Sequence, residues 1–262
     1  MKSAYIFYSV FFYFFILSLS VNAAQTDLEY EGVFKTIEHP SEFIKAEFHL
    51  AKSENKKLIF VLGGNWCHDS RSIAKKLDDA ELSEYIQANY RISMVDVGYL
   101  NQGFEFTEKA EMKTFYATPT VLIFDPVSEN LINASDMHIW ANAFDLSQEE
   151  TNLYFERYID SKGVTESPQL TKAQKQHLSK LDTFTELQEI RIKTSYKTIG
   201  PLLERYKDGD VDENFKPYWK ALSDLRMTLP SDVKKIREQI LISPDNELAN
   251  VSFPKYTSLP WE

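Results

Sequence analysis

The sequence has one cysteine, Cys67, and its neighbours suit thiol chemistry. Cys67 follows an apolar run and two glycines, and it precedes a segment with helical spacing. This order of strand, turn, cysteine and helix predicts that Cys67 lies at or just before the first turn of a helix. Unpaired N–H groups at a helix N-terminus stabilise a thiolate, the nucleophilic form of cysteine. Ser70 lies three residues later, where its hydroxyl or backbone N–H can reach the sulfur.

The same residues also have less reactive interpretations. Cys67 can be a relic on a binding scaffold, and Ser70 can serve only to cap the helix. His68 and Asp69 are expected to be exposed residues of its first turn. The run Cys-His-Asp is not a hydrolytic triad, because triad members meet in space from separate elements. Cys67, His68 and the distant His138 would make a thin ligand set, so we predict no metal and no cofactor.

Helices and strands alternate around Cys67. Residues 58–62 are continuously apolar and end at a Gly-Gly pair, which is typical of a parallel strand buried on both faces. Ser41 is expected to cap the helix before this strand. The alternation predicts an α/β sheet with crossover helices. The other expected elements are a helix through Ile73 and Leu77, a helix at 81–90, a strand at 92–97, a polar helix at 105–115, a strand at 120–124 and a weaker strand at 130–134.

The second half of the sequence has a helical pattern throughout. Strand signals disappear after about Leu146, and we expect this half to pack against the α/β half. Thr183 and Glu186 resemble a capping box, and Pro230 is expected to open the last helix. The expected helices span residues 147–160, 171–182, 184–193, 199–207, 215–229 and 232–242.

Two motifs carry a resemblance to a known family. The segment LIFVLGGNWCHDSRSIAKKL resembles the strand, Trp-Cys-x-x-Cys turn and helix of thioredoxin-like proteins, with Ser70 in place of the second cysteine. Ala-Thr-Pro-Thr at 117–120 resembles the segment whose proline is cis in that family and faces the active-site cysteine. The resemblance covers about residues 30–145. It implies a thioredoxin-like α/β fold, a central mixed sheet flanked by helices, with an α-helical C-terminal extension.

The resemblance also implies roles for particular residues. Cys67 and Ser70 would be the catalytic pair, and Trp66, Thr118 and Pro119 would line the groove that binds an extended substrate. We predict a monothiol protein that forms mixed disulfides in thiol-disulfide exchange or thiol protection. Its expected partners are protein thiols, protein disulfides or glutathione.

Two departures from the family limit the chemistry. Without a second cysteine, ordinary dithiol turnover is excluded, and an external thiol must release the substrate from Cys67. Val61 stands where thioredoxins carry a buried acid. Whether the protein is a thiol-disulfide oxidoreductase therefore stays open. The alternative is a redox-inactive binding or adaptor module that uses the same groove and the helical extension.

The N-terminal residues predict export. Lys2, an apolar stretch at 4–19 and the small-residue ending at 21–23 match a secretory signal peptide cleaved after Ala23, with a retained membrane anchor as the alternative. We therefore expect a signal peptide at 1–23, a thioredoxin-like domain at 24–145 and a helical extension at 146–262. The predicted location is the periplasm.

The net charge of the chain bears on its partners. Lys and Arg total 29 against 39 Asp and Glu, a formal charge of -10. An acidic balance of this size argues against nucleic-acid binding and against electrostatic docking on anionic membranes. We expect no stable membrane insertion after the signal is removed.

Overall fold

The computed structural model describes residues 30, 32–161 and 169–262. The expected signal peptide at 1–23 lies outside the described residues, so it stays a prediction. None of the described helices combines the length and the apolar character that crossing a membrane requires.

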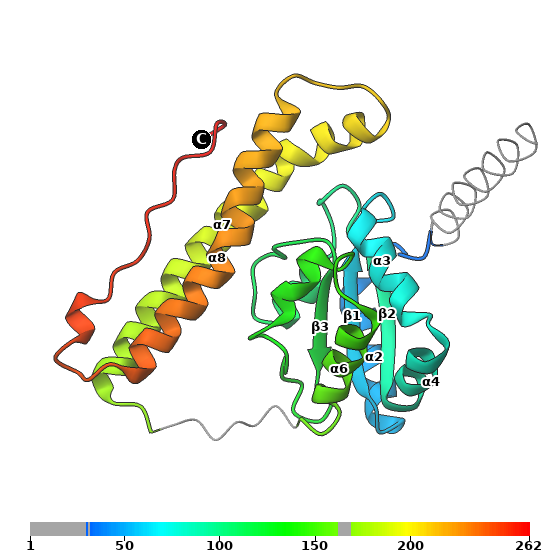
Figure 1. Ribbon diagram of the computed structural model, residues 1–262, viewed down its shortest axis with the longest axis horizontal. Helices are drawn as coiled ribbons and strands as arrows, with labels where there is room; N and C mark the ends of the chain where they lie inside the picture. Colours follow the sequence, from blue (N-terminus) through cyan, green and yellow to red (C-terminus); the bar gives the residue numbers. More distant parts are fainter. Residues whose placement is uncertain (1–29, 31, 162–168) are drawn as a thin grey trace, which may run out of the picture.

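A three-stranded mixed sheet forms the centre of the α/β half (Figure 1). Strand β1 (Lys57–Gly63) lies between β2 (Tyr90–Asp96) and β3 (Thr120–Phe124). The pairing of β1 with β2 is parallel and that with β3 is antiparallel. The C-terminal ends of β1 and β2 therefore lie beside the start of β3, at the same end of the sheet. The segments that carry Cys67 and Pro119 both adjoin this end of the sheet.

Helices cover both faces of the sheet. Phe60 of β1 packs in a core cluster with residues of α2 (Pro40–Ser53) and α5 (Phe104–Lys109). Its neighbours Ile59 and Val61 belong to a second cluster on the opposite face. This alternation explains the continuous apolar run, since both faces of the strand are buried. The second cluster draws on α3 (His68–Leu77), α4 (Ala80–Asn89), the 3-10 helix η1 (Met137–Asn142) and α6 (Gln148–Tyr158).

Two long helices form a hairpin that makes up most of the C-terminal half (Figure 1). They are α7 (Lys172–Lys207) and α8 (Phe215–Ile242), and a short 3-10 helix, η2 (Leu248–Asn250), follows. The first core cluster continues into this hairpin through buried residues such as Ile199 and Leu222. The predicted packing of the helical half against the α/β half is therefore confirmed.

The chain returns along α7 after η2. The indole nitrogen of Trp261 donates to the Ser195 hydroxyl at 3.2 Å. The Glu262 carboxylate forms an ion pair with Arg191 at 2.5 Å. These contacts tie the last residues to the middle of α7.

The predicted breaks inside the hairpin are wrong. Residues 172–207 form one helix rather than three, and Pro230 lies inside α8 rather than at the start of a new helix. The Thr183 hydroxyl donates to the Ser179 carbonyl within α7, so it caps nothing. Pro201 in α7 and Pro230 in α8 each remove one helical hydrogen bond. Buried residues on both sides of each proline keep the helix packed on the core.

Other predicted elements differ at their ends. Helix α2 begins at Pro40 with His39 as N-cap, not Ser41, because proline suits the first helical position. The helix expected at 105–115 ends at Lys109, and Glu111 then has a positive φ of 60°. The strand expected at 130–134 is only an isolated bridge between Phe124 and Leu131.

Helix α6 was expected in the C-terminal extension, and its packing places it with the sheet instead. Tyr154 and Phe155 lie in the same cluster as Val61. The Ser147 and Glu150 capping box starts this helix. The change of packing partner thus falls after α6, later in the chain than the boundary expected at 145.

Candidate functional site

Cys67 ends the turn between β1 and α3. It is the N-cap residue of α3, with an extended backbone, and its own N–H donates to the Gly64 carbonyl at 2.9 Å. Arg71 donates to the Asn65 carbonyl at 2.9 Å, and the Asn65 side chain bonds the backbone of Phe34 through both its oxygen and its nitrogen. We call residues 63–67 the cysteine turn; contacts with nearby residues and with Phe34 hold it in place.

The sulfur of Cys67 contacts the second motif directly. The thiol donates to the Thr118 carbonyl at 3.1 Å, and the Thr118 hydroxyl donates back to the sulfur at 3.3 Å. The peptide bond between Thr118 and Pro119 is cis. The structure thus brings together three of the five predicted site residues, and Cys67 itself is partly exposed.

Ser70 does not make the contact expected of it. Its side chain is fully buried, and its hydroxyl accepts from the Gly64 N–H at 3.2 Å. In the described structure no hydrogen bond joins Ser70 to the sulfur of Cys67. A Cβ atom at Gly63 would lie 2.8 Å from the Ser70 hydroxyl oxygen, so this glycine makes room for it. In this structure Ser70 supports the cysteine turn.

Trp66, in the cysteine turn, packs against the loop that follows β2. Its indole nitrogen donates to the Gly98 carbonyl at 2.7 Å, and its ring stacks on Tyr99 with centroids 6.2 Å apart. The ammonium group of Lys207, from the end of α7, lies 5.8 Å from the indole centroid. The helical hairpin therefore reaches the residue next to the cysteine.

His68 and Asp69 contact another part of the chain. The His68 ring lies 4.1 Å from the Phe144 ring, centroid to centroid, and the Asp69 carboxylate accepts from the Phe144 N–H at 3.0 Å. Phe144 is 57% exposed. The two residues after Cys67 therefore hold an exposed aromatic ring beside the site, and the expectation that they were merely exposed is incomplete.

Residues of α7 hold the segment that leads to Pro119. The Glu189 carboxylate accepts from the Lys113 N–H at 2.9 Å and from the Tyr116 hydroxyl. The Tyr196 hydroxyl donates to the Phe115 carbonyl at 2.6 Å. We call residues 111–119 the cis-proline segment. Sequence reasoning missed both α7 residues, although a Glu and a Tyr seven positions apart on one apolar helix face are a signal for such anchoring.

Three acids and phenols near the site that are partly or fully buried have shifted pKa values. Burial raises the pKa of Asp96, which ends β2 opposite Gly63 and accepts from the Gly98 N–H at 3.1 Å. Burial also raises the pKa of Glu189, and burial together with the Glu189 charge raises the pKa of Tyr116. Sequence reasoning missed Asp96, which puts an acid beside the cysteine turn.

The arrangement supplies a nucleophile but few other reactive groups. The sulfur has a hydroxyl donor and a carbonyl acceptor, both from Thr118. Among the described residues, no group of three or more His, Cys, Asp or Glu side chains is placed to hold a metal ion. The chemistry that these contacts support is reaction at the sulfur itself.

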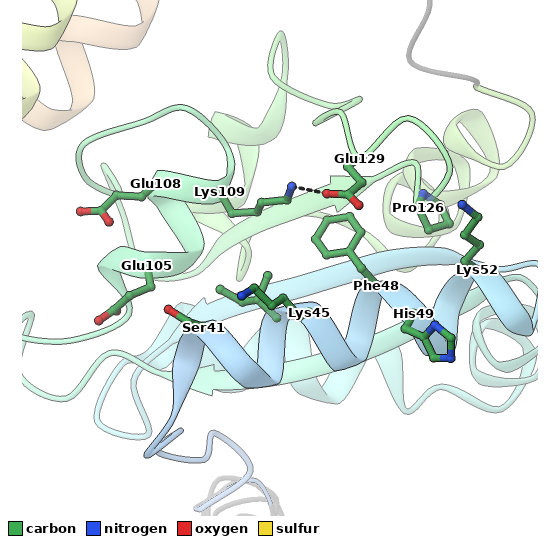
Figure 2. Close-up of a pocket in the computed structure, with 11 residues that line it drawn as sticks. Ser41, Lys45, Phe48, His49, Lys52, Glu105, Glu108, Lys109, Pro126 and Glu129 are labelled. Carbon is green, nitrogen blue, oxygen red and sulfur yellow. Dashed lines mark hydrogen bonds and ion pairs between the residues drawn. The ribbon is translucent and has the colours of Figure 1, made fainter.

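A pocket of about 610 Å³ lies away from Cys67, between α2 and α5 (Figure 2). Lys109 forms an ion pair with Glu129 at 2.6 Å, and its ammonium group lies 4.7 Å from the Phe48 ring centroid. Pro126 and Glu129 follow the C-terminal end of β3, whereas Pro119 precedes its start. This pocket is therefore at the other end of the strand from the sulfur.

No family model matches the sequence. No curated protein matches it either. Among solved structures, the chain is similar to a disulphide isomerase from Xylella fastidiosa Temecula1, with 20% sequence identity and a TM-score of 0.40 over 47% of this chain and 95% of the other.

Proposed function

We propose that the protein is a thioredoxin-like monothiol protein that forms mixed disulfides through Cys67. The contact of the Cys67 sulfur with Thr118, next to a cis proline, is the observation that carries this proposal. The position of Cys67 before a ten-residue helix supports it, since helix N-termini favour thiolates. A mixed sheet with helices on both faces is consistent with the thioredoxin-like fold.

The proposed reaction is one thiol-disulfide exchange. The Cys67 thiolate attacks one sulfur of a partner disulfide, a new S–S bond forms, and the other partner sulfur leaves as a thiolate. The sequence has one cysteine, so the protein cannot resolve this bond internally. An external thiol such as glutathione attacks the mixed disulfide and returns Cys67 to its reduced state.

We further propose that the protein works in the cell envelope. The apolar N-terminal stretch with its small-residue ending supports export. Disulfides persist in oxidising compartments, where a monothiol protein would meet disulfide-bearing partners. Export is tested by whether protein made in cells starts at residue 24.

A redox-inactive binding module is the second candidate. Phe144, whose exposed ring contacts His68, and Trp66, which precedes Cys67, place two aromatic side chains near the cysteine, and aromatic side chains often dominate binding to partner proteins. In that case partner binding survives Cys67→Ala.

The decisive experiment measures the reactivity of Cys67. We expect iodoacetamide to label Cys67 in the native protein at pH 7, because the side chain is partly exposed. Oxidised glutathione should give one adduct by intact mass. Cys67→Ala should give none and keep the thermal unfolding midpoint. Native protein that resists both reagents contradicts the mixed-disulfide proposal and favours the binding module.

A further inference from the structure

A second, smaller pocket lies beside Pro119. Its volume is about 50 Å³, and it is bounded by the cis-proline segment, η1 and α8. Most of its lining is apolar, with one strongly charged side chain, Arg226 from α8. The apolar lining includes Pro119, Met137, Ala141, Met227 and Pro230.

Arg226 is 6% exposed and lacks a full set of partners. Its Nη2 donates to the Ser223 hydroxyl over a long 3.4 Å. Its Nε and Nη1 have no acceptor among the described residues. A buried guanidinium without a carboxylate is costly in free energy, so an anion that supplies acceptors here would be bound favourably.

Aromatic rings pack against the Arg226 guanidinium, but this packing does not supply hydrogen-bond acceptors for its N–H groups. Its central carbon lies 4.9 Å from the Trp219 ring centroid and 5.7 Å from that of Tyr196. Cation–π contact uses the flat face of a guanidinium, whereas its N–H groups point outward in the plane. The aromatic rings therefore contact the guanidinium, and Nε and Nη1 still have no acceptor among the described residues.

We propose that this pocket binds a carboxylate on a short aliphatic stem, carried by the molecule that is joined to Cys67. The paired N–H groups of arginine match a carboxylate, and the apolar lining matches the methylene groups of a Glu side chain. About 50 Å³ holds a few water-sized groups, so it admits a side-chain tip rather than a whole peptide. This inference rests on the proposed function and adds the chemistry of the partner.

The pocket is within reach of a chain bound at the sulfur. Thr118 contacts the sulfur, and the next residue, Pro119, lines the pocket. An extended chain advances roughly 3.3 Å per residue, so we place the carboxylate one or two residues from the partner cysteine. The carboxylate can come from a protein segment or from the γ-glutamyl group of glutathione.

The test compares matched peptides whose single cysteine is joined to 2-thiopyridine in an activated disulfide. The pairs are acetyl-Glu-Ala-Cys-Ala-amide and acetyl-Ala-Cys-Ala-Glu-amide, each against its Gln counterpart, with the exchange rate read from released thiopyridone. We expect the Glu peptide of at least one pair to react about tenfold faster, as a charge-assisted hydrogen bond allows. Faster exchange with glutathione disulfide than with cysteinylglycine disulfide would assign the carboxylate to glutathione.

Arg226→Gln should bring each Glu-to-Gln rate ratio close to one, while Lys216→Gln, exposed on the same helix, should leave it unchanged. Wild-type ratios near one with normal Cys67 reactivity overturn the inference and leave the proposed function standing. If Cys67 reacts with no peptide, the proposed function fails. Titration of Cys67→Ser with N-acetylglutamate amide, read by tryptophan fluorescence, then tests the pocket: saturable binding lost in Arg226→Gln supports it, and no binding overturns it.

Discussion

The two segments that meet at the Cys67 sulfur are held in different ways. In the cysteine turn, the Gly64 N–H is bonded by Ser70, only six positions away. In the cis-proline segment, the Lys113 N–H is bonded by Glu189, which is 76 positions away. The cysteine turn is therefore supported by α3 together with Phe34 and Gly98, and the cis-proline segment by the helical hairpin.

This difference gives the hairpin a role in the site. Helix α7 contacts the cis-proline segment through Glu189 and Tyr196, and α8 places Arg226 beside Pro119. Lys207 also reaches the ring of Trp66. The extension is thus a structural part of the site, and changes in the hairpin should affect the sulfur's surroundings.

The largest expected effect comes from the contact between α7 and the loop after β2. A Cβ atom at Gly200 would lie 2.4 Å from the Tyr99 carbonyl oxygen, a backbone atom that cannot swing away. Gly200→Ala should therefore lower the free energy of unfolding by about 3 kcal/mol, although Ala within a helix normally gains about 1 kcal/mol. Urea unfolding measures this. Thr194→Ala, exposed on the same helix, is the control, and a gain in stability at Gly200 would contradict the docking.

Glu189→Ala removes the support of the cis-proline segment. The Lys113 N–H and the Tyr116 hydroxyl lose their acceptor, and we expect a loss of about 2 kcal/mol and slower alkylation of Cys67. Glu186→Ala is a matched control, because Glu186 reaches Lys113 only through an exposed ion pair at 3.2 Å. If Glu189→Ala lowers stability but the rate of Cys67 alkylation does not change, the hairpin does not influence the site.

Ser70→Ala tests the local half in the same way. It leaves the Gly64 N–H without its acceptor, and we expect a loss of about 1 kcal/mol with no change in hydrogen exchange of α7. Ser72→Ala, whose hydroxyl makes a longer 3.5 Å bond to Ala143, should have a smaller effect. If α7 loses protection in Ser70→Ala, the two halves are less independent than their contacts indicate.

The smallest expected effect is that of Asp96→Asn. A carboxyl whose pKa is raised in the folded protein destabilises it once the pH exceeds the unfolded pKa, because the unfolded chain then ionises more readily. Asn should accept the same Gly98 N–H and raise stability at pH 7 by a few tenths of a kcal/mol, after screening by solvent. The gain should vanish below about pH 4, near the unfolded pKa. Thermal unfolding of both proteins from pH 3 to 7 tests this, and an equal gain at pH 3 would contradict it.

Local patterns account for what could be predicted from the sequence. The apolar run of β1, the two glycines after it and the adjacent helix predicted where Cys67 lies, because all these signals are neighbours in the chain. The α/β sheet flanked by helices and the helical C-terminal region are confirmed. The sequence left two roles open for Ser70, and its hydroxyl accepts from the Gly64 N–H instead of bonding the sulfur.

Distant contacts account for what could not be predicted. Glu189 and Arg226 stand in helices whose amphipathic spacing can mark an anchoring face, but it does not tell which distant residues that face contacts. Pro201 and Pro230 signal helix ends in isolation, yet both lie within continuous helices. Burial of Leu203 and Leu229 beside them offsets the lost hydrogen bonds, and that burial is a property of the assembled fold.

The anchoring of the cis-proline segment by α7 has a thermodynamic consequence. A molecule that binds at Pro119 only when the segment is in place must stabilise the docked hairpin by the same free energy that docking contributes to its binding. Occupancy of the site is therefore readable far from it, as slower hydrogen exchange of amides along α7 around Glu189 and Tyr196. Hydrogen exchange in the hairpin therefore reports whether the site beside Cys67 is occupied.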